Sequence, residues 1–220
     1  GVALASRPPL SMLATLFILL TLCTVSFDGI AHTFWWLGLS GINPLEFPGR
    51  SAVIILNSAG LAGAFILLSG LYLASIGIGR WIAGEASPID RLAGRLVWSM
   101  VPISIAFHAA HYLTALLVNG QYLLIAASDP FASGWDLLGF AHHHVTTSFL
   151  NTAAGAQAIF AAQTSIIVVG HVVGVVIAHL IAVDVCDKER TARLLERPLA
   201  MLMVAYTMLG LWTLSTPTIG

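Results

Sequence analysis

The stretch that decides the fold is residues 97–124, VWSMVPISIAFHAAHYLTALLVNGQYLL. It contains no Asp, Glu, Lys or Arg, and it exceeds the roughly 20 apolar residues that a helix needs to cross a bilayer. Two histidines, His108 and His111, stand near its middle. Because an ionisable side chain inside a membrane is costly, such a residue indicates a functional site.

The composition of the whole chain is that of a membrane protein. Of its 220 residues, 58% are hydrophobic and 9% are charged, whereas a soluble domain carries about 25% charged residues. The mean hydropathy is +0.91. We predict an all-α, polytopic helical membrane protein with about five transmembrane helices plus short interfacial helices. The net charge of −1 leaves no basic surface for nucleic acid, so the expected partner is the lipid bilayer.

Uncharged runs and turn signals divide the chain into spans of a single transmembrane domain, residues 1–220. The expected spans are 10–27, 51–79, 97–124, 158–183 and 198–215. Pro102 is expected to kink the third span, and Pro198 to occupy the first turn of the fifth. Between the first two spans, Trp35 and Trp36 favour a short helix at the level of the headgroups.

Basic residues are distributed unevenly between the two sides that five spans define. Arg7 and the loops 80–95 and 184–197 share one side and carry eight basic residues, whereas the other side has only Arg50. Cytoplasmic loops are enriched in Lys and Arg. We therefore expect a membrane protein with a cytoplasmic N-terminus and an external C-terminus.

The first residues lack an initiator Met and lead into a span without a cleavage site. We therefore expect the chain to be the C-terminal part of a longer polypeptide. Its expected protein partners are the missing N-terminal part or other membrane subunits. Small residues on the second and fourth spans, Gly60 with Gly63 and Gly170 with Gly174, suit close contacts with helices of this chain or of a partner.

Four histidines lie in the third and fourth spans, which run in opposite directions. His111 and His171 stand near the middle of their spans, and His108 shares a helix face with His111. His179 lies about 12 Å further inward than His171. Imidazole is the commonest nitrogen ligand of zinc, copper and iron, and three histidines with an open position suit a catalytic metal. The pattern predicts a transition-metal site formed by these four histidines.

Three carboxylates near the outer face are candidates for the same site. Asp28 is expected to ligate the metal or to hydrogen-bond a ligating histidine, and Asp129 or Asp136 to act as the general base. Facing histidines at matched depth also suit haem b, which His111 and His171 would then hold. A competing interpretation is that each histidine only hydrogen-bonds a neighbouring helix.

Four segments carry a resemblance to a known family. They are SFDGIAHTFWWLGLSGINPLEFPGR, VPISIAFHAAHYLTALLVNGQYLLIAASDPFASGWDLLGF, VVGHVVGVVIAHLIAVDV and RPLAMLMVAYTMLGLWTLS. They resemble the C-terminal half of a bacterial membrane-protein family commonly labelled fenitrothion hydrolase, whose members are longer. The family pattern falls on Asp28, His108, His111, Asp129, Asp136, His171 and His179. The resemblance implies membrane-bound hydrolysis of an organophosphorus ester. The triplet 142–144 of histidines is not part of that pattern.

The leading hypothesis is therefore a metal-dependent hydrolase of phosphoester-like substrates. Its metal would polarise a phosphoryl oxygen or lower the pKa of a bound water. Three other functions remain open. They are a haem-binding or electron-transfer subunit, a non-catalytic subunit of a larger membrane complex, and a metal or proton transporter with His179 as an inner relay.

Overall fold

The computed structural model describes residues 8–46, 49–140, 143–186 and 188–216, apart from the side chains of Pro44 and Arg50. In this part of the chain the regular elements are helices, which confirms the all-α fold. In chain order they are α2 (Met12–Ala31), α3 (Phe34–Leu39), η1 (Pro44–Glu46), α4 (Arg50–Ala83), α5 (Ile89–Leu96), η2 (Val97–Ser99), α6 (Met100–His111), α7 (Leu113–Ser128), η3 (Ser148–Asn151), α8 (Ala153–Val185) and α9 (Glu189–Ser215).

Five helical segments of the described chain are long and apolar enough to cross a membrane. They are Met12–Ala31, Ser51–Ala83, Ile89–His111, Ala153–Val185 and Glu189–Ser215. The number agrees with the five spans expected from the sequence. The protein is therefore an all-α polytopic membrane protein in which the third segment joins α5, η2 and α6.

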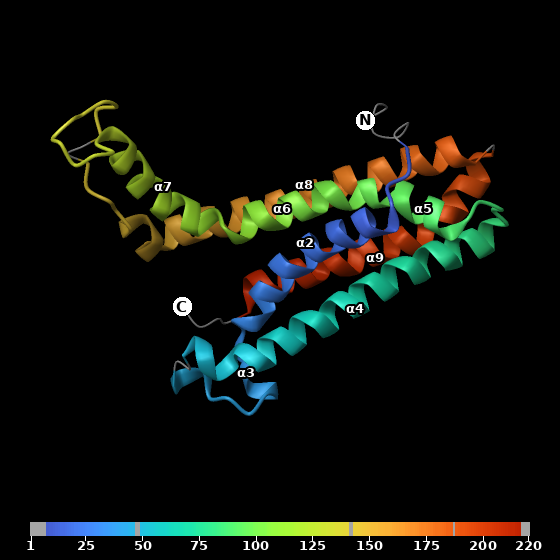
Figure 1. Ribbon diagram of the computed structural model, residues 1–220, viewed down its shortest axis with the longest axis horizontal. Helices are drawn as coiled ribbons and strands as arrows, with labels where there is room; N and C mark the ends of the chain where they lie inside the picture. The colour runs from blue at the N-terminus through green and yellow to red at the C-terminus, as the bar shows by residue number, and fades with distance from the viewer. Residues whose placement is uncertain (1–7, 47–48, 141–142, 187, 217–220) are drawn as a thin grey trace.

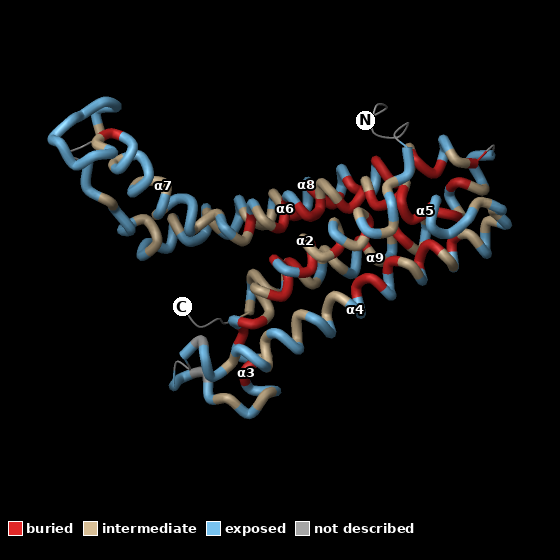
Figure 2. Tube along the Cα trace, viewed as in Figure 1, coloured by how far each residue is buried: buried red, intermediate tan, exposed pale blue. Residues whose placement is uncertain are grey.

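The long helices gather at one end and diverge toward the other (Figure 1). α8 packs against α6 and α9, α4 packs against α9, and α2 contacts both α4 and α6. α7 extends away from the bundle beyond α6. Figure 2 shows that the buried residues concentrate at the end near α5, here called the packed end, and that α7 is exposed.

The core of the packed end is built around side chains that solvent does not reach, among them Leu19, Tyr72, Ile76 and Leu195. The Tyr72 hydroxyl donates to the carbonyl of Ala93 at 2.7 Å, so the one polar atom of this large side chain has a buried partner. These residues belong to one buried cluster, which joins α2, α4, α5 and α9 at the packed end.

Both described basic loops lie at the packed end. Arg80 donates its Nε–H to the Ser87 carbonyl at 2.8 Å, and Arg95 pairs with Asp184 of α8. The Glu85 carboxylate accepts from the Ser87 hydroxyl at 2.7 Å and from its N–H at 3.1 Å, and these bonds lower the pKa of Glu85. The two loops thus share one side, as the five-span topology requires; Arg7 lies outside the described residues.

The third expected span differs from the observed helices at both ends. The helical segment begins at Ile89 and ends at His111, and Tyr112 separates it from α7. A 3₁₀ turn over Val97–Ser99 precedes Pro102, as expected where the proline ring opposes the carbonyl of the fourth residue before it. His108 and His111 therefore lie in the last turn of α6, at the end of the observed helical segment and not near its middle as predicted.

The last helix begins earlier than expected. α9 starts at Glu189, so Pro198 is interior to the helix and does not begin it. The polar stretch before Pro198 is helical because its apolar residues recur on one face: Ala192, Leu195 and Leu199 are all fully buried. Burial of this face against the neighbouring helices stabilises a segment that composition alone marks as a loop.

Candidate functional site

The site centres on Asp28, the only charged side chain of α2. It stands in the last turn of the helix, where the backbone dipole disfavours a negative charge. His111, at the end of α6, offsets this cost, because its Nε2 lies 2.7 Å from Asp28 Oδ2. With the carboxylate ionised, His111 is the donor. Asp28 is 44% exposed and His111 29% exposed, so this is a half-buried carboxylate–imidazole pair.

His32 approaches the same carboxylate from one turn further along the chain. Its Nδ1 lies 2.8 Å from the Asp28 carbonyl oxygen and 4.0 Å from Asp28 Oδ1. A carbonyl can only accept, so Nδ1 carries the proton in the neutral ring and Nε2 is left as an acceptor. His108 is fixed in the same way, since its Nδ1 donates to the Ser104 carbonyl at 2.8 Å.

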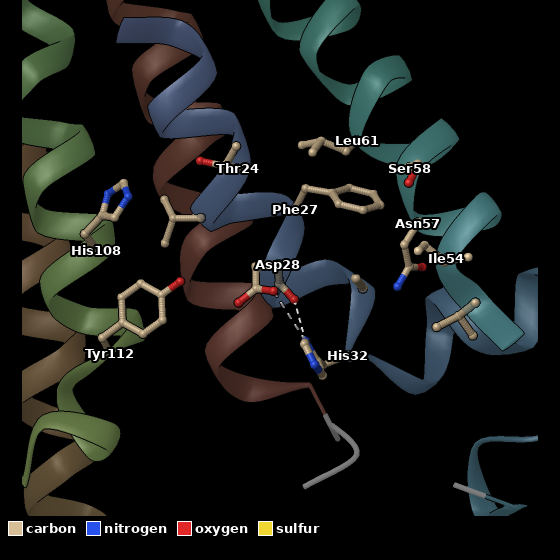
Figure 3. A pocket seen from close by; sticks show the side chains of 13 residues that line it. Thr24, Phe27, Asp28, His32, Ile54, Asn57, Ser58, Leu61, His108 and Tyr112 are labelled. Carbon is tan, nitrogen blue, oxygen red and sulfur yellow. Dashed lines mark hydrogen bonds and ion pairs between the residues drawn. The ribbon is translucent and has the colours of Figure 1, made fainter. Parts of the chain in front are cut away.

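A cavity of about 430 Å³ opens in front of Asp28, between α2, α4 and α6. We call it the acid pocket. Asp28 and His32 line one side, His108 and Tyr112 another, and Asn57 faces them from α4. Figure 3 shows the Tyr112 hydroxyl pointing toward α2 and the Asp28 carboxylate. The volume falls within the roughly 300–1,000 Å³ typical of small-molecule sites.

The charge of the acid pocket is one-sided. Its lining residues, all in the described chain, include one carboxylate and no Lys or Arg. Asn57 Oδ1 already accepts the Trp36 indole N–H at 2.9 Å. The carboxylate and the Nε2 atoms of His32 and His108 are acceptors. The arrangement therefore favours a ligand that donates hydrogen bonds or carries positive charge.

His111 does not line the acid pocket; it lines a separate small cavity. This space, of about 20 Å³, is lined by residues that include Gly29, His111 and Thr213, and it has room for about one water molecule. His111 thus contacts both a space of water size and the Asp28 carboxylate, and its hydrogen bond orients that carboxylate.

The other two predicted histidines are elsewhere. His171 is buried on α8, where its Nδ1 donates to the Ile167 carbonyl at 2.8 Å and Nε2 has no hydrogen-bond partner. Its ring contacts that of Phe107, with centroids 5.8 Å apart. His179 lies further along α8, and its Nδ1 is within 2.9 and 3.0 Å of the two Glu196 oxygens.

The two acids predicted as general bases organise their own loop. The Asp129 carboxylate accepts from the N–H groups of Ser133 and Gly134, each at 2.8 Å. Asp136 accepts from the Ser128 hydroxyl at 2.6 Å. Neither lines the acid pocket. In the neighbouring triplet, His143 and His144 are exposed, and His142 lies outside the described residues.

The arrangement of the described histidines does not fit the predicted metal site or the predicted haem site. Among the described residues no three His, Cys, Asp or Glu side chains are grouped so as to hold a metal ion. His108, His111, His171 and His179 instead have different partners. For haem, His111 directs Nε2 to Asp28, and the cavity beside its ring is far smaller than a porphyrin. The residues as arranged fit neither group.

The sequence predicted Asp28 and His111 as site residues but not that these two bond each other, and it did not predict His32, Asn57 or Tyr112. The position of His32 could have been predicted, because it follows Asp28 by four residues, the spacing that brings helical neighbours together. Asn57 has no such signal, because only the packing of α4 against α2 places it opposite the pair.

Comparison of the chain with models of protein families, with curated proteins and with solved structures finds no match in any of the three. The resemblance to the fenitrothion hydrolase family therefore stays a prediction, and the function is argued from the acid pocket.

Proposed function

We propose that this membrane protein binds a small neutral or cationic hydrogen-bond donor in the acid pocket and accepts a proton from it at Asp28. The observation that carries the proposal is the Asp28–His111 pair at 2.7 Å, with the carboxylate lining a cavity whose described lining residues include no Lys or Arg. The reaction class is general acid–base chemistry, for which a carboxylate within hydrogen-bond reach of the substrate proton is required.

The chain's own residues have distinct roles in this proposal. Asp28 takes the proton from the ligand or, when the ligand is a cation, neutralises it. His111 is a positioning residue, because its Nε2–H holds Oδ2 and turns the carboxylate toward the pocket. His108 offers an acceptor nitrogen, and Tyr112 a hydroxyl, on the opposite wall.

Binding of butylammonium to the purified protein tests the proposal. Isothermal titration of wild type should show binding that weakens at least about tenfold in Asp28→Asn, a change of roughly 1.4 kcal/mol. Asp129→Asn is the matched control, because Asp129 binds only backbone amides of its own loop. Equal binding by wild type and Asp28→Asn would refute the proposal.

A hydrolytic form of this chemistry is the activity that the resemblance implies. In that reaction Asp28 would take a proton from an attacking water, whose oxygen forms a bond to phosphorus as the bond to the leaving alkoxide or phenoxide breaks. Because the described lining includes no Lys or Arg, an uncharged organophosphorus triester suits the pocket better than an anionic phosphate. Hydrolysis of a chromogenic neutral triester should fall about 10²–10⁴-fold in Asp28→Asn, the range for loss of a general base. An equal loss in Asp136→Asn but not in Asp28→Asn would instead support the outer-loop acid.

Metal dependence and haem binding are separate questions with direct readouts. Elemental analysis of purified wild type, His111→Ala and His171→Ala reports whether either histidine holds a transition metal. An absorption spectrum reports haem through its Soret band. A metal content that falls in His111→Ala would favour the predicted metal site over the metal-free pair proposed above.

A further inference from the structure

A second cavity adjoins the acid pocket. It lies between α2, α4 and α9, has a volume of about 310 Å³, and is lined by apolar residues that include Leu67, Leu71, Leu202, Ala205 and Leu209. We call it the apolar groove. Leu67 and Leu71 are also among the large hydrophobic side chains that the bundle leaves exposed, so the groove opens on the surface that faces lipid in a membrane protein.

The two cavities meet at Phe27. This side chain lines both of them. On α4, Leu61 lines the acid pocket and Ala64 lines the apolar groove; residues three apart lie on one helix face, about 4.5 Å apart along the axis. Trp36 holds Phe27 in place with an edge-to-face contact, their ring centroids 5.1 Å apart. A polar compartment and an apolar one are therefore neighbours along α4, and the Phe27 ring, which packs over Gly60, lies between them.

The polar atoms in the wall of the groove satisfy each other. The Tyr206 hydroxyl donates to Ser26 Oγ at 2.6 Å, and Ser26 in turn donates to the Leu22 carbonyl at 2.8 Å. These hydroxyls need no ligand partner. The groove therefore offers dispersion contacts to a hydrocarbon chain, whereas the acid pocket offers a charge to a polar head.

We propose that the natural ligand is a single-chain amphiphile with a cationic amine head. Its head lies at Asp28, and its alkyl chain passes Phe27 into the apolar groove. Charge complementarity carries the choice of head, because Asp28 is the one carboxylate among the described residues that line either cavity, and these residues include no Lys or Arg. The binding of the head at Asp28 rests on the proposed function. The new element is the alkyl chain of the ligand, which selects the substrate class.

The test compares two probes on the full chain in phosphatidylcholine nanodiscs: labelled dodecylammonium and butylammonium. A longer chain also concentrates a probe in the bilayer, since lipid tails are as apolar as the groove, so chain length alone decides nothing. The deciding variant is Ala205→Phe, which fills the groove. Val204→Phe is the matched control, because Val204 is 54% exposed on the same helix and does not line the groove.

The expected result is that Ala205→Phe weakens dodecylammonium binding at least about tenfold and leaves butylammonium binding unchanged, while Val204→Phe affects neither. If Ala205→Phe lowers the unfolding temperature, Leu67→Trp fills the groove from α4 and replaces it. If a groove-filled variant binds dodecylammonium as well as wild type does, and Asp28→Asn still weakens both probes, the amphiphile proposal is wrong but the proposed function stands. If Asp28→Asn weakens neither probe, both the amphiphile proposal and the proposed function are wrong.

Discussion

At the scale of single residues, the placement of Asp28 is the feature that needs explanation. A carboxylate in the last turn of an otherwise uncharged helix opposes the helix dipole. The structure offsets this with His111, 83 residues away in the chain. Both residues were identifiable from the sequence, because ionisable groups in apolar runs are rare. Their pairing was not, since two helices can present such residues to each other, to a metal or to water.

A double-mutant cycle measures the pair. His111→Ala leaves the Asp28 carboxylate without its donor, and Asp28→Asn removes the charge. Because the pair is half-buried, we expect a coupling free energy of about 1 kcal/mol. Thermal or denaturant unfolding of the wild type, the two single variants and the double variant in detergent gives the value. Strict additivity of the two single effects would show that the pair does not interact.

Glu85 makes the stability of the packed end depend on pH. Its pKa is lowered from the usual 4.5 by hydrogen bonds from Ser87. A lowered folded-state pKa stabilises the fold above the unfolded value, and this contribution is lost as the pH falls through the folded value. The stability advantage of wild type over Glu85→Gln should therefore be full near neutral pH and shrink below 4.5. When Ser87 is replaced by Ala in both proteins, the pH-dependent difference in stability between them should be smaller. An undiminished difference would mean that a group other than Ser87 lowers the pKa of Glu85.

At the scale of elements, glycines set how closely helices approach. A Cβ on Gly170 would collide with the Ala106 side chain and lie 3.0 Å from the Pro102 carbonyl, and one on Gly174 would lie 2.8 Å from the Ser99 carbonyl. The predicted small-residue face of the fourth span is thus used within the chain, between α8 and α6. Gly63 on α4 differs, since no described atom beyond its own stretch of helix lies within 4 Å of its Cβ position.

Alanine at these two glycines should have opposite effects. Gly170→Ala forces α8 away from α6, and we expect a loss of about 1–3 kcal/mol, typical of overpacking. Gly63→Ala meets open space and should be neutral or more stable by up to about 1 kcal/mol, because alanine favours helix. Unfolding in detergent measures both. A similar loss at Gly63 would mean that this face is also packed.

The helices themselves were largely predictable, and their ends were not. Hydropathy located five apolar segments because a bilayer imposes a minimum length. It did not detect the interruption at Tyr112, since the residues on both sides are equally apolar. It also missed the start of α9, where Ala192, Leu195 and Leu199 are buried against neighbours that the local sequence does not reveal. Tertiary contacts decided these boundaries.

At the scale of the whole molecule, the clustering of basic residues at the packed end gives the bundle a polarity. The two connections at this end and the helix ends beside them carry seven basic residues: Arg80 in α4, Arg91 and Arg95 in α5, Lys188 before α9, and Arg190, Arg193 and Arg197 in α9. Since such loops stay in the cytoplasm, we propose that the packed end faces inward and that the loop after α7 faces outward. The acid pocket then lies toward the outer surface.

Cysteine labelling tests this orientation. Ala86, after α4, and Ser133, after α7, are both exposed, whereas the native Cys23 and Cys186 are buried and not joined in a disulfide. In right-side-out vesicles an impermeant maleimide should label Ser133→Cys and not Ala86→Cys, and in inverted vesicles the pattern should reverse. Labelling of Ala86→Cys from the outside would place the packed end outward.

The unequal lengths of the helices bear on how the bilayer meets the protein. α2 has 20 residues and α4 has 34, which at about 1.5 Å per residue correspond to roughly 30 and 51 Å. A hydrocarbon layer of about 30 Å matches the length of α2 and is thinner than the length of α4. Therefore α4 must tilt or thicken the bilayer around it. Hydrophobic mismatch along this one helix would then thin or thicken the annulus of lipid beside Asp28, and acyl-chain length in reconstituted membranes would tune access to it.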